Sequence, residues 1–551
     1  MRRYFEFVRA EAGRIDRLTV LMTAVAGIAN GLAVATAIHT AEKLQPGSLH
    51  FRELLLFVSL MALFVYCKRY SMNESTRMME GVVRTLRLRI LGKLRTTGLL
   101  GQEGIDKGIF YSSLTADTST ISTSTVTAVN AVSSSIMLVF ILLYIAVMST
   151  KALVISCGII GLLIFFYLGN EKRISSALVK SSVSENRFMN NLGGLLAGFK
   201  ELKMNRRKYD DFSREELEGV IDDSAELKTD AGLGLNVTIL IAQTFLLIAI
   251  GGILFLLPQF DSSDISIIPK LIALLLFASG PIGDFAMAIP AISRAEAAID
   301  NIRALERLID QGQSRNETIC ERQPIEPLSW GTIRLDDIHF QFPLREGGRP
   351  FSIGPMDLIF HKGEITFIVG GNGSGKSTFL KVLTSLYEPT GGHIRLDDRE
   401  ITPYNRASYR DLFSTIFTDY YLFRRLVGID TPDGDRIQTL LERMELADKT
   451  SIEHGEITNC DLSTGQKKRL ALVTSVLEDK PVMIFDEWAA DQDPVFRQFF
   501  YDVLLPELKA QGKTVIAVTH DDRYFHAADR VYKMEYGRFV AYEEHAGGLG
   551  T

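Results

Sequence analysis

Long apolar runs in the first part of the chain and short ones in the last part divide the sequence into two unlike halves. Six long runs lie at 18–38, 53–70, 126–148, 152–168, 233–257 and 267–289. An α-helix needs about 20 apolar residues to cross the hydrocarbon core of a bilayer. The pattern therefore predicts an all-α domain of six membrane-spanning helices rather than six buried helices of a soluble protein.

The connections between the six runs differ in length and in charge. Lysine and arginine gather in the N-terminal tail and after the second and fourth runs, whereas the other three connections hold few. Because basic connections stay on the cytoplasmic side, both chain ends are expected in the cytoplasm. The outer connections are short, and the one around Ser149 is predicted to be a tight hairpin. The first run is too long for a cleaved signal peptide.

The two basic connections are long and have a helical pattern. Apolar residues recur in them at three- and four-residue spacing, as at Val82 and Leu86. We expect the membrane helices to continue into the cytoplasm and to turn there through short transverse segments near 99–110 and 196–207. The Ser/Thr-rich stretch 112–124 is interpreted as the polar inner extension of the third helix.

Beyond residue 310 the pattern becomes that of a soluble α/β domain. The segment 311–330 is polar and contains two prolines, which predicts a linker. Short apolar runs then alternate with helical patterns. We therefore expect a transmembrane domain at 1–310, a linker at 311–330 and a nucleotide-binding domain at 331–551.

Composition excludes several classes of protein. Of the 551 residues, 46% are hydrophobic and 23% are charged, which excludes a disordered chain. The net charge of −6 argues against a general nucleic-acid binder, so no nucleic acid is expected as a partner. The four cysteines are scattered without a CxxC pair, so neither a zinc site nor a disulfide scaffold is expected.

A phosphate-binding loop carries the first chemical signal. The apolar run 365–369 opens directly into a glycine-rich loop that matches G-x-x-x-x-G-K-[ST] between a strand and a helix. Backbone N–H groups of such a loop surround phosphate oxygens, and the helix dipole favours their charge. Lys376 is expected to reach the β- and γ-phosphates, and the Ser377 hydroxyl to ligate Mg²⁺. The predicted nucleotide-binding residues are Gly370, Gly371, Asn372, Gly373, Ser374, Gly375, Lys376, Ser377 and Thr378.

Two carboxylates follow a second buried run. The run 481–485 ends in Asp486 and Glu487. A carboxylate at the end of a strand beside a phosphate loop suits Mg²⁺ coordination, either directly or through water. Glu487 is then the candidate catalytic residue, which accepts a proton from the attacking water or orients it.

A further motif, Leu462-Ser463-Thr464-Gly465-Gln466, lies between these two sites. Ser463 suits a helix N-cap, and Gly465 permits a close backbone approach. The motif resembles L-S-x-G-Q, the signature of ATP-binding cassette transporters. In that family it binds the γ-phosphate of ATP held by the opposite subunit. The resemblance therefore implies that Ser463, Gly465 and Gln466 bind ATP across a dimer interface.

Other positions match the same family in chain order. Phe342 corresponds to the aromatic residue that stacks on adenine, and His520 to the switch histidine that contacts the γ-phosphate. The residues 490–493 take the place of the loop that crosses the dimer interface. ATP and Mg²⁺ are the cofactors that this resemblance implies.

Two positions depart from the family pattern. Thr418 stands where the family has a Mg²⁺-contacting glutamine, and Trp488 replaces the usual proline after the catalytic glutamate. The sequence leaves open whether Thr418 reaches the metal through water or whether Asp419 takes over the task.

A narrower resemblance covers nearly the whole chain. The phrases at 371–377, 417–419, 463–470, 486–494 and 520–522, with 199–205 in the membrane half, are similar to the bacterial cyclic-peptide exporter group. That group includes exporters of pyoverdine-siderophore precursors, of syringomycin-type lipopeptides and of microcin. The resemblance implies an ATPase in the bacterial inner membrane, among membrane lipids, that exports a peptide-like cargo. A peptide siderophore precursor is the leading cargo, and the alternatives are a lipid or drug flippase and a non-transporting, ATP-gated regulator.

The chain carries one phosphate loop and one signature, so the resemblance implies a pair of chains that share two ATP sites. A homodimer is the first expectation, and a heterodimer is the alternative. Asp284 is the candidate cargo contact within the membrane domain, because an acidic residue in a membrane helix is costly and often functional. It has two structural alternatives, a partner for an arginine at the inner end and a cytoplasm-facing carboxylate on a kinked helix.

Overall fold

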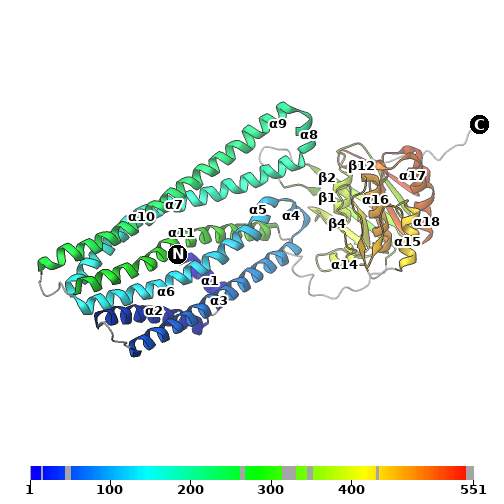
Figure 1. Cartoon of the computed structure of the whole chain (residues 1–551). Coiled ribbons are helices and arrows are strands. Elements are labelled where there is room, and N and C mark those ends of the chain that lie inside the picture. The colour runs from blue at the N-terminus through cyan, green and yellow to red at the C-terminus, as the bar shows by residue number, and fades with distance from the viewer. Residues whose placement is uncertain are drawn as a thin grey trace, which may run out of the picture. The chain divides into compact units, whose positions relative to one another are not determined.

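The computed structural model in Figure 1 describes residues 2–13, 16–43, 51–260, 267–312, 330–343, 351–429 and 433–540. These residues form two compact units. One consists of Met1–Arg95 and Glu103–Gln311, and the other of Thr96–Gln102 and Gly312–Thr551. Most of the expected linker at 311–330 lies outside the described residues, as does the stretch that joins α2 to α3.

The described part of the first unit is built from helices. They are α1 (Arg2–Glu11), α2 (Arg17–Lys43), α3 (Phe51–Arg95), α5 (Lys107–Ser112), α6 (Thr118–Met148), α7 (Thr150–Ala197), α8 (Phe199–Met204), α9 (Arg206–Phe212), α10 (Gly219–Phe260) and α11 (Ile268–Gly312). A π-helical turn joins α5 to α6 and another joins α9 to α10. All six predicted apolar runs lie on these helices wherever the structure describes them.

Among the residues that the structure describes, four helical stretches are long and apolar enough to cross a membrane. They are Arg17–Ala41, Lys107–Met148, Arg206–Gln259 and Ile268–Gly312. The two remaining predicted spans, 53–70 and 152–168, lie on α3 and α7, which are 45 and 48 residues long. The apolar part of α7, Thr150–Leu163, is a shorter apolar helix of fewer than 18 residues.

The cytoplasmic extensions expected from the sequence are helical. The helices α3 and α7 run on to Arg95 and Ala197, and short helices follow at both expected turns: α4 (Leu99–Glu103) with α5, and α8 with α9. Ser149 separates α6 from α7 and accepts a hydrogen bond from the Ala152 N–H at 3.3 Å, which caps α7. The predicted hairpin and the helical Ser/Thr-rich extension are therefore both confirmed.

Helix pairs hold the first unit together. The helix α7 packs along α10, and α2 packs along α3 and α6 (Figure 1). Buried residues of α3 at helical spacing, such as Met79 and Leu86, share a core with α11 residues such as Ile299 and Ile302. Arg89 of α3 also donates hydrogen bonds to Glu11 of α1 and Glu306 of α11.

The described part of the second unit contains three sheets. Its strands are β1 (Thr332–Gln341), β2 (Ser352–His361), β3 (Ile365–Val369), β4 (Gly391–Leu396), β5 (Arg399–Glu400), β6 (Phe413–Ile416), β7 (Ile452–Glu453), β8 (Glu456–Ile457), β9 (Val482–Asp486), β10 (Thr514–Val518), β11 (Arg530–Glu535) and β12 (Arg538–Val540). Its helices include α13 (Lys376–Leu383), α14 (Arg406–Arg410), α15 (Gly434–Arg443), α16 (Thr464–Leu477), α17 (Pro494–Phe499) and α18 (Leu505–Ala510). The strand orders are β12-β11-β3-β10-β9-β6, β2-β1-β4-β5 and β7-β8.

The six-stranded sheet is parallel except at β12, and both of its faces are buried. Alternate residues of β3, β9 and β10 face two different cores: Phe367 and Phe485 belong to one, and Ile484 and Ile516 to the other. Such double burial explains why these strands are continuous apolar runs. Because Ile516 pairs with both Thr366 and Ile484, the three strands are level, and their carboxyl ends meet at one edge.

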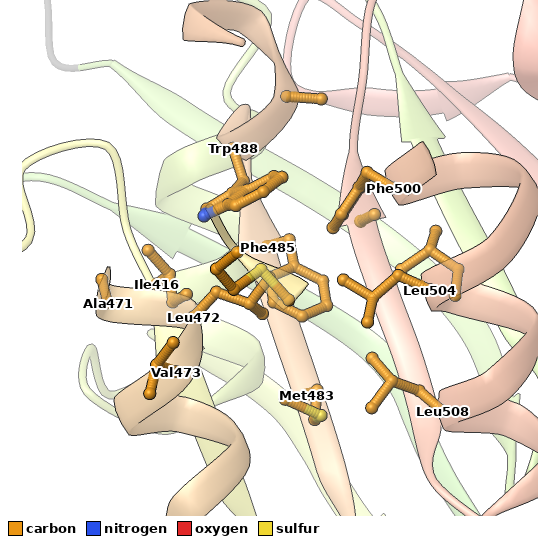
Figure 2. Close-up of a cluster of buried hydrophobic side chains, with 14 of the residues drawn as sticks. Ile416, Ala471, Leu472, Val473, Met483, Phe485, Trp488, Phe500, Leu504 and Leu508 are labelled. Atoms are coloured by element: carbon orange, nitrogen blue, oxygen red, sulfur yellow. The ribbon is translucent and has the colours of Figure 1, made fainter. Parts of the chain in front are cut away.

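Trp488 fills the core at that edge (Figure 2). Its side chain is 1% exposed and stacks on Phe500 with a 4.5 Å centroid separation. Its Nε1 donates a hydrogen bond to the Lys468 carbonyl at 2.8 Å. The proline that the family usually has at this position offers no donor, so the indole is a feature of this chain that ties α16 to the end of β9.

Replacing Trp488 with Phe is expected to destabilise the second unit by about 1 kcal/mol, because the hydrogen bond from Nε1 to the Lys468 carbonyl is lost while that carbonyl keeps its donor within α16. Urea unfolding of the full chain in detergent, followed by loss of a bound fluorescent ATP analogue, measures the shift. The matched control is Trp330→Phe, which removes the other buried indole but none of the hydrogen bonds of the described residues. Equal shifts in both variants would contradict this role.

Candidate nucleotide-binding site

The phosphate loop lies at the carboxyl edge of β3, in the predicted strand–loop–helix context. Gly375 has a φ of 106°, and a Cβ there would lie 2.8 Å from Ile353 Cγ2. The left-handed turn therefore favours glycine. The helix α13 begins at the next residue, Lys376, so its unpaired N–H groups face the loop. This arrangement suits an anion such as a nucleotide phosphate.

The Lys376 side chain is held inside the loop. It is 5% exposed, and its Nζ donates hydrogen bonds to the Gly370 and Gly371 carbonyls at 3.0 Å each. Its Nζ also lies 3.7 Å from Oε1 of Glu487. The ammonium group therefore already lies where the loop would receive phosphate oxygens.

Three oxygen-bearing side chains meet beside the phosphate loop. Asp486 accepts hydrogen bonds from the Ser377 side chain and from Thr418, whose Oγ1 lies 3.4 Å from Oδ2. The other carboxylate oxygen, Oδ1, is buried without a hydrogen-bond partner among the described residues. Hard cations such as Mg²⁺ prefer oxygen ligands, so this orphaned oxygen fits a metal ligand.

The structure distinguishes Thr418 from Asp419 as the residue that takes the place of the family's glutamine. Since Ile416 of β6 pairs with Phe485 of β9, Thr418 is brought against Asp486. Asp419 is exposed and makes no hydrogen bond with Asp486 among the described residues. The geometry therefore favours Thr418 over Asp419 as the residue beside the metal.

Burial raises the pKa of the Asp486 carboxyl above 3.8, and the charge of Glu487 adds to the shift, while hydrogen bonds from Ser377 and Thr418 oppose it. The charged form is thus disfavoured in the folded state. The burial of Asp486 therefore costs the folded state nothing at low pH, where the carboxyl is neutral. The free energy of unfolding falls as the pH rises through the raised pKa.

Asp486→Asn is therefore expected to stabilise the nucleotide-free protein near neutral pH, with a gain that shrinks as the pH falls toward the ordinary carboxyl range of about 4. The variant should also lose the extra stability that Mg²⁺ confers on the ATP-bound protein. Thermal unfolding of the full chain across pH, with and without Mg²⁺ and ATP, measures both effects. A variant less stable than wild type without nucleotide at neutral pH would contradict the burial argument.

Glu487 and His520 form a close pair beyond the phosphate loop. His520 follows β10, and its Nε2 lies 2.8 Å from Oε1 of Glu487. Glu487 has a φ of 50°, a left-handed conformation that directs its carboxylate away from the line of β9. A cavity of about 320 Å³ adjoins both residues and is also lined by Arg497 and Asp521. A carboxylate and an imidazole beside a cavity can hold a water molecule and receive its proton.

The signature residues begin α16. Ser463 caps this helix in a reciprocal arrangement with Gln466, with N–H to side-chain distances of 3.0 and 3.4 Å. A Cβ at Gly465 would lie 2.9 Å from the Asp491 carbonyl oxygen, so the helix start packs closely on the 488–493 segment. Among the described residues, no hydrogen bond or ion pair links Ser463, Gly465 or Gln466 to the phosphate loop of the same chain.

Two buried cations that follow the signature, Lys468 and Arg469, were not predicted to be buried. The Lys468 Nζ donates to the Glu487 carbonyl at 2.9 Å and lies 2.7 Å from the Asp491 carboxylate. Arg469 lies over the Phe496 ring at 3.6 Å and bonds to the Gln492 side chain and the Asp493 carboxylate. The only sequence signal was the Lys-Lys-Arg run after Gln466, a pattern more typical of an exposed helix face.

Phe342 lies among other aromatic rings. It contacts Phe340, Tyr387 and Phe351 at centroid separations of 5.1, 5.7 and 6.3 Å. Phe351 is 41% exposed, and its ring reaches toward Gly375 of the phosphate loop. Phe351 is therefore a second aromatic residue able to contact a base, and the sequence reasoning missed it.

The structure thus brings most of the predicted site residues together at one edge of the sheet. They are the loop at 370–377, Thr418, Asp486, Glu487 and His520. Asp284, the cargo candidate, lies in the other unit on α11 and accepts a hydrogen bond from Ser134 Oγ at 2.6 Å. It forms no ion pair with an arginine among the described residues, so the arginine-partner alternative gains no support.

Comparison with known proteins gives a consistent result. The "ABC transporter" family model matches residues 353–490. The chain is 37% identical over 407 residues to ATP-binding protein SyrD of Pseudomonas syringae pv. syringae, which covers 71% of this chain and 70% of that protein. It is 32% identical over 207 residues to the probable syringafactin export ATP-binding/permease protein SyfD of P. syringae pv. syringae strain B728a, covering 34% and 31%.

A solved structure shows a similar fold. It is that of a bacterial Atm1-family ABC exporter with ATP bound, with a TM-score of 0.73. The match covers 95% of this chain and 93% of the other at 17% identity, so it reports on the fold alone. The fold it indicates is a helical membrane domain followed by an α/β ATPase domain.

Proposed function

Because this chain belongs to the ATP-binding cassette transporters of the bacterial cyclic-peptide exporter group, we propose that it exports a peptide-like secondary metabolite. ATP-driven export is the activity of the family, and the cargo and the assembly are the proposed parts. A peptide siderophore precursor, such as the pyoverdine precursor, is the cargo proposed first. The observation that carries the proposal is the likeness to SyrD, which extends over more residues than the ATPase unit contains.

The working unit is proposed to be a homodimer in the bacterial inner membrane, with six spans per chain and both termini in the cytoplasm. Each chain has a phosphate loop and a signature helix that share no hydrogen bond or ion pair within the described residues. Two chains in head-to-tail arrangement would each supply Ser463, Gly465 and Gln466 to the ATP held by the partner. Phe342, with Phe351 beside it, would support the adenine base.

The chain's own residues account for hydrolysis. Lys376 and the N–H groups of the phosphate loop hold and neutralise the β- and γ-phosphates. Mg²⁺, when bound, would further neutralise these phosphates, and Ser377 and Asp486 would hold it, with Thr418 beside them. Glu487 orients the attacking water and accepts its proton, and His520, 2.8 Å away, holds the Glu487 carboxylate in place.

The short helices at the cytoplasmic turns are proposed to transmit closure of the ATPase units to the membrane helices. Leu99 and Leu100 of α4 pack against the core of the ATPase unit, to which Thr96–Gln102 belongs. A rigid helix tied to that core would move with it when ATP closes the dimer. Since ATP binds the closed state better, its binding and hydrolysis can drive the cycle.

Transport into inverted membrane vesicles tests the proposal. Wild-type vesicles should accumulate the pyoverdine precursor in the presence of ATP, and Glu487→Gln vesicles should not. ATPase stimulation in nanodiscs by the peptide, compared with added lipid, provides the second readout. Stimulation by lipid alone would contradict the peptide assignment, and equal accumulation in the two kinds of vesicle would exclude an ATP-driven pump.

A further inference from the structure

The membrane unit contains a cavity whose walls carry both signs of charge. It has a volume of about 450 Å³ and lies between α2, α3, α6 and α11. Lys68 of α3 and Asp284 of α11 line it, together with Asn30 of α2. The rings of Phe57, Phe64 and Phe277 supply much of its apolar wall. Its volume falls in the range of about 300–1,000 Å³ that is typical of small-molecule sites.

Within the described residues, the two charged groups do not neutralise each other. The Lys68 ammonium makes neither a hydrogen bond nor an ion pair there, and its contact is the face of the Phe64 ring, 5.8 Å from the centroid. The Asp284 carboxylate accepts a hydrogen bond from Ser134, and its other oxygen has no partner there. Charged groups at membrane depth are costly and usually paired, so an ammonium and a carboxylate that line one cavity without pairing indicate a ligand that completes them.

The ordinary explanation for a lysine near the end of a membrane span is that its ammonium extends to the water interface. Lys68 stands near the end of the predicted span 53–70, so this explanation would place its ammonium group in water. The structure instead places its side chain in the wall of the same cavity as Asp284, three ring-bearing residues and Asn30. A phosphate alone would be repelled by Asp284, and an amine alone by Lys68.

We propose that this cavity binds a zwitterionic segment of a peptide-like cargo. The cargo's carboxylate would meet Lys68, its ammonium would meet Asp284, and its apolar side chains would lie on the phenylalanine rings. Asn30 would hydrogen-bond to a backbone amide. This inference rests on the proposed export of a peptide-like metabolite and adds the charge pattern that such a cargo must have.

The test uses binding, which needs neither transport nor hydrolysis. The probe is a short leucine-rich peptide with free amino and carboxyl termini and a fluorophore on a lysine side chain. Two matched probes are acetylated at the amino terminus or amidated at the carboxyl terminus. Fluorescence anisotropy with the full chain in nanodiscs of phosphatidylcholine should show that the free peptide binds about tenfold more tightly than either capped peptide.

Two substitutions test which side chain binds which terminus of the peptide. Asp284→Asn should abolish the preference for the free amino terminus while keeping that for the free carboxyl terminus. Lys68→Gln should do the reverse. The capped probes are compared on the unaltered protein, so the idea stays testable even where a variant fails to fold. Equal binding of all three probes to wild type would overturn it.

A lipid headgroup that carries both charges is the alternative ligand of this cavity. Phosphatidylethanolamine has a phosphate and a primary ammonium that can donate N–H hydrogen bonds, whereas the trimethylammonium of phosphatidylcholine cannot. Displacement of the peptide by phosphatidylethanolamine at its membrane concentration would overturn the peptide assignment. The two proposals also fail separately. Charge-selective binding without vesicle accumulation of any cargo would support this site and refute export, whereas accumulation without charge-selective binding would refute this site alone.

Discussion

Replacing Glu487 with Gln is expected to slow ATP hydrolysis by about 100- to 10,000-fold while ATP binding is retained, because a positioned general base contributes a factor of that size. Glutamine has nearly the same shape and can still meet Nε2 of His520, which lies 2.8 Å from Oε1 in the native pair. The contacts of Lys376 with the Gly370 and Gly371 carbonyls are untouched. The change therefore removes the proton acceptor, together with the charge that Glu487 places 3.7 Å from Lys376 Nζ.

Phosphate release by the full chain in nanodiscs measures the rate, and a fluorescent ATP analogue measures binding. Glu442→Gln is the matched control, because Glu442 is an exposed residue of α15 whose contact is the Gln438 side chain. That control should hydrolyse ATP at the wild-type rate. A Glu487→Gln protein that keeps a tenth or more of wild-type turnover would show that Glu487 is not the base.

The features that local sequence determines were predicted from it. The run 365–369 coincides with β3, and the run 481–485 lies within one residue of β9, since a strand buried on both faces is a continuous apolar run. The phosphate loop stands in its predicted context because the preceding strand and following helix carry their own signals. Ser463 was predicted to be an N-cap from its side chain alone, and it is one.

Contacts between distant segments could not be predicted in the same way. The position of Thr418 beside Asp486 depends on the register in which β6 lies next to β9, which no local pattern reveals. The Lys-Lys-Arg run at 467–469 has the composition of a solvated helix face, yet Lys468 and Arg469 are buried. Their partners at 487–493 are brought to them by the packing of α16 against the end of β9.

The packing of α16 against the end of β9 places Lys468 in contact with the segment that follows Glu487. Lys468 is 4% exposed and bridges two groups of the segment that leads from Glu487, the proposed catalytic base, toward the expected dimer interface. Its Nζ holds the Glu487 carbonyl, at 2.9 Å, and the Asp491 carboxylate, at 2.7 Å. Because Glu487 adopts a left-handed conformation, a fixed carbonyl is one of the restraints that keep its side chain aimed at the site.

Lys468→Met is therefore expected to lower kcat for ATP hydrolysis by about 100-fold, the cost of a displacement of about 1 Å at a reacting group. The KM for ATP should stay near its wild-type value, since Lys468 touches neither the phosphate loop nor Phe342 among the described residues. Methionine keeps the length and apolar stem of the side chain, so the change removes chiefly the charge. A loss of kcat with an unchanged number of ATP-analogue molecules bound per chain distinguishes a positioning role from unfolding, which would lower that number.

Two comparisons sharpen this last test. Lys467→Met, one residue earlier on the same helix, removes a charge that makes no ion pair among the described residues and should leave kcat unchanged. The double change Lys468→Met with Asp491→Ala leaves no unpaired carboxylate beside the site, and it should recover part of the lost rate if that charge disturbs Glu487. If Lys468→Met hydrolysed ATP as fast as Lys467→Met, then the contact with the Glu487 carbonyl would have no role in positioning the catalytic carboxylate.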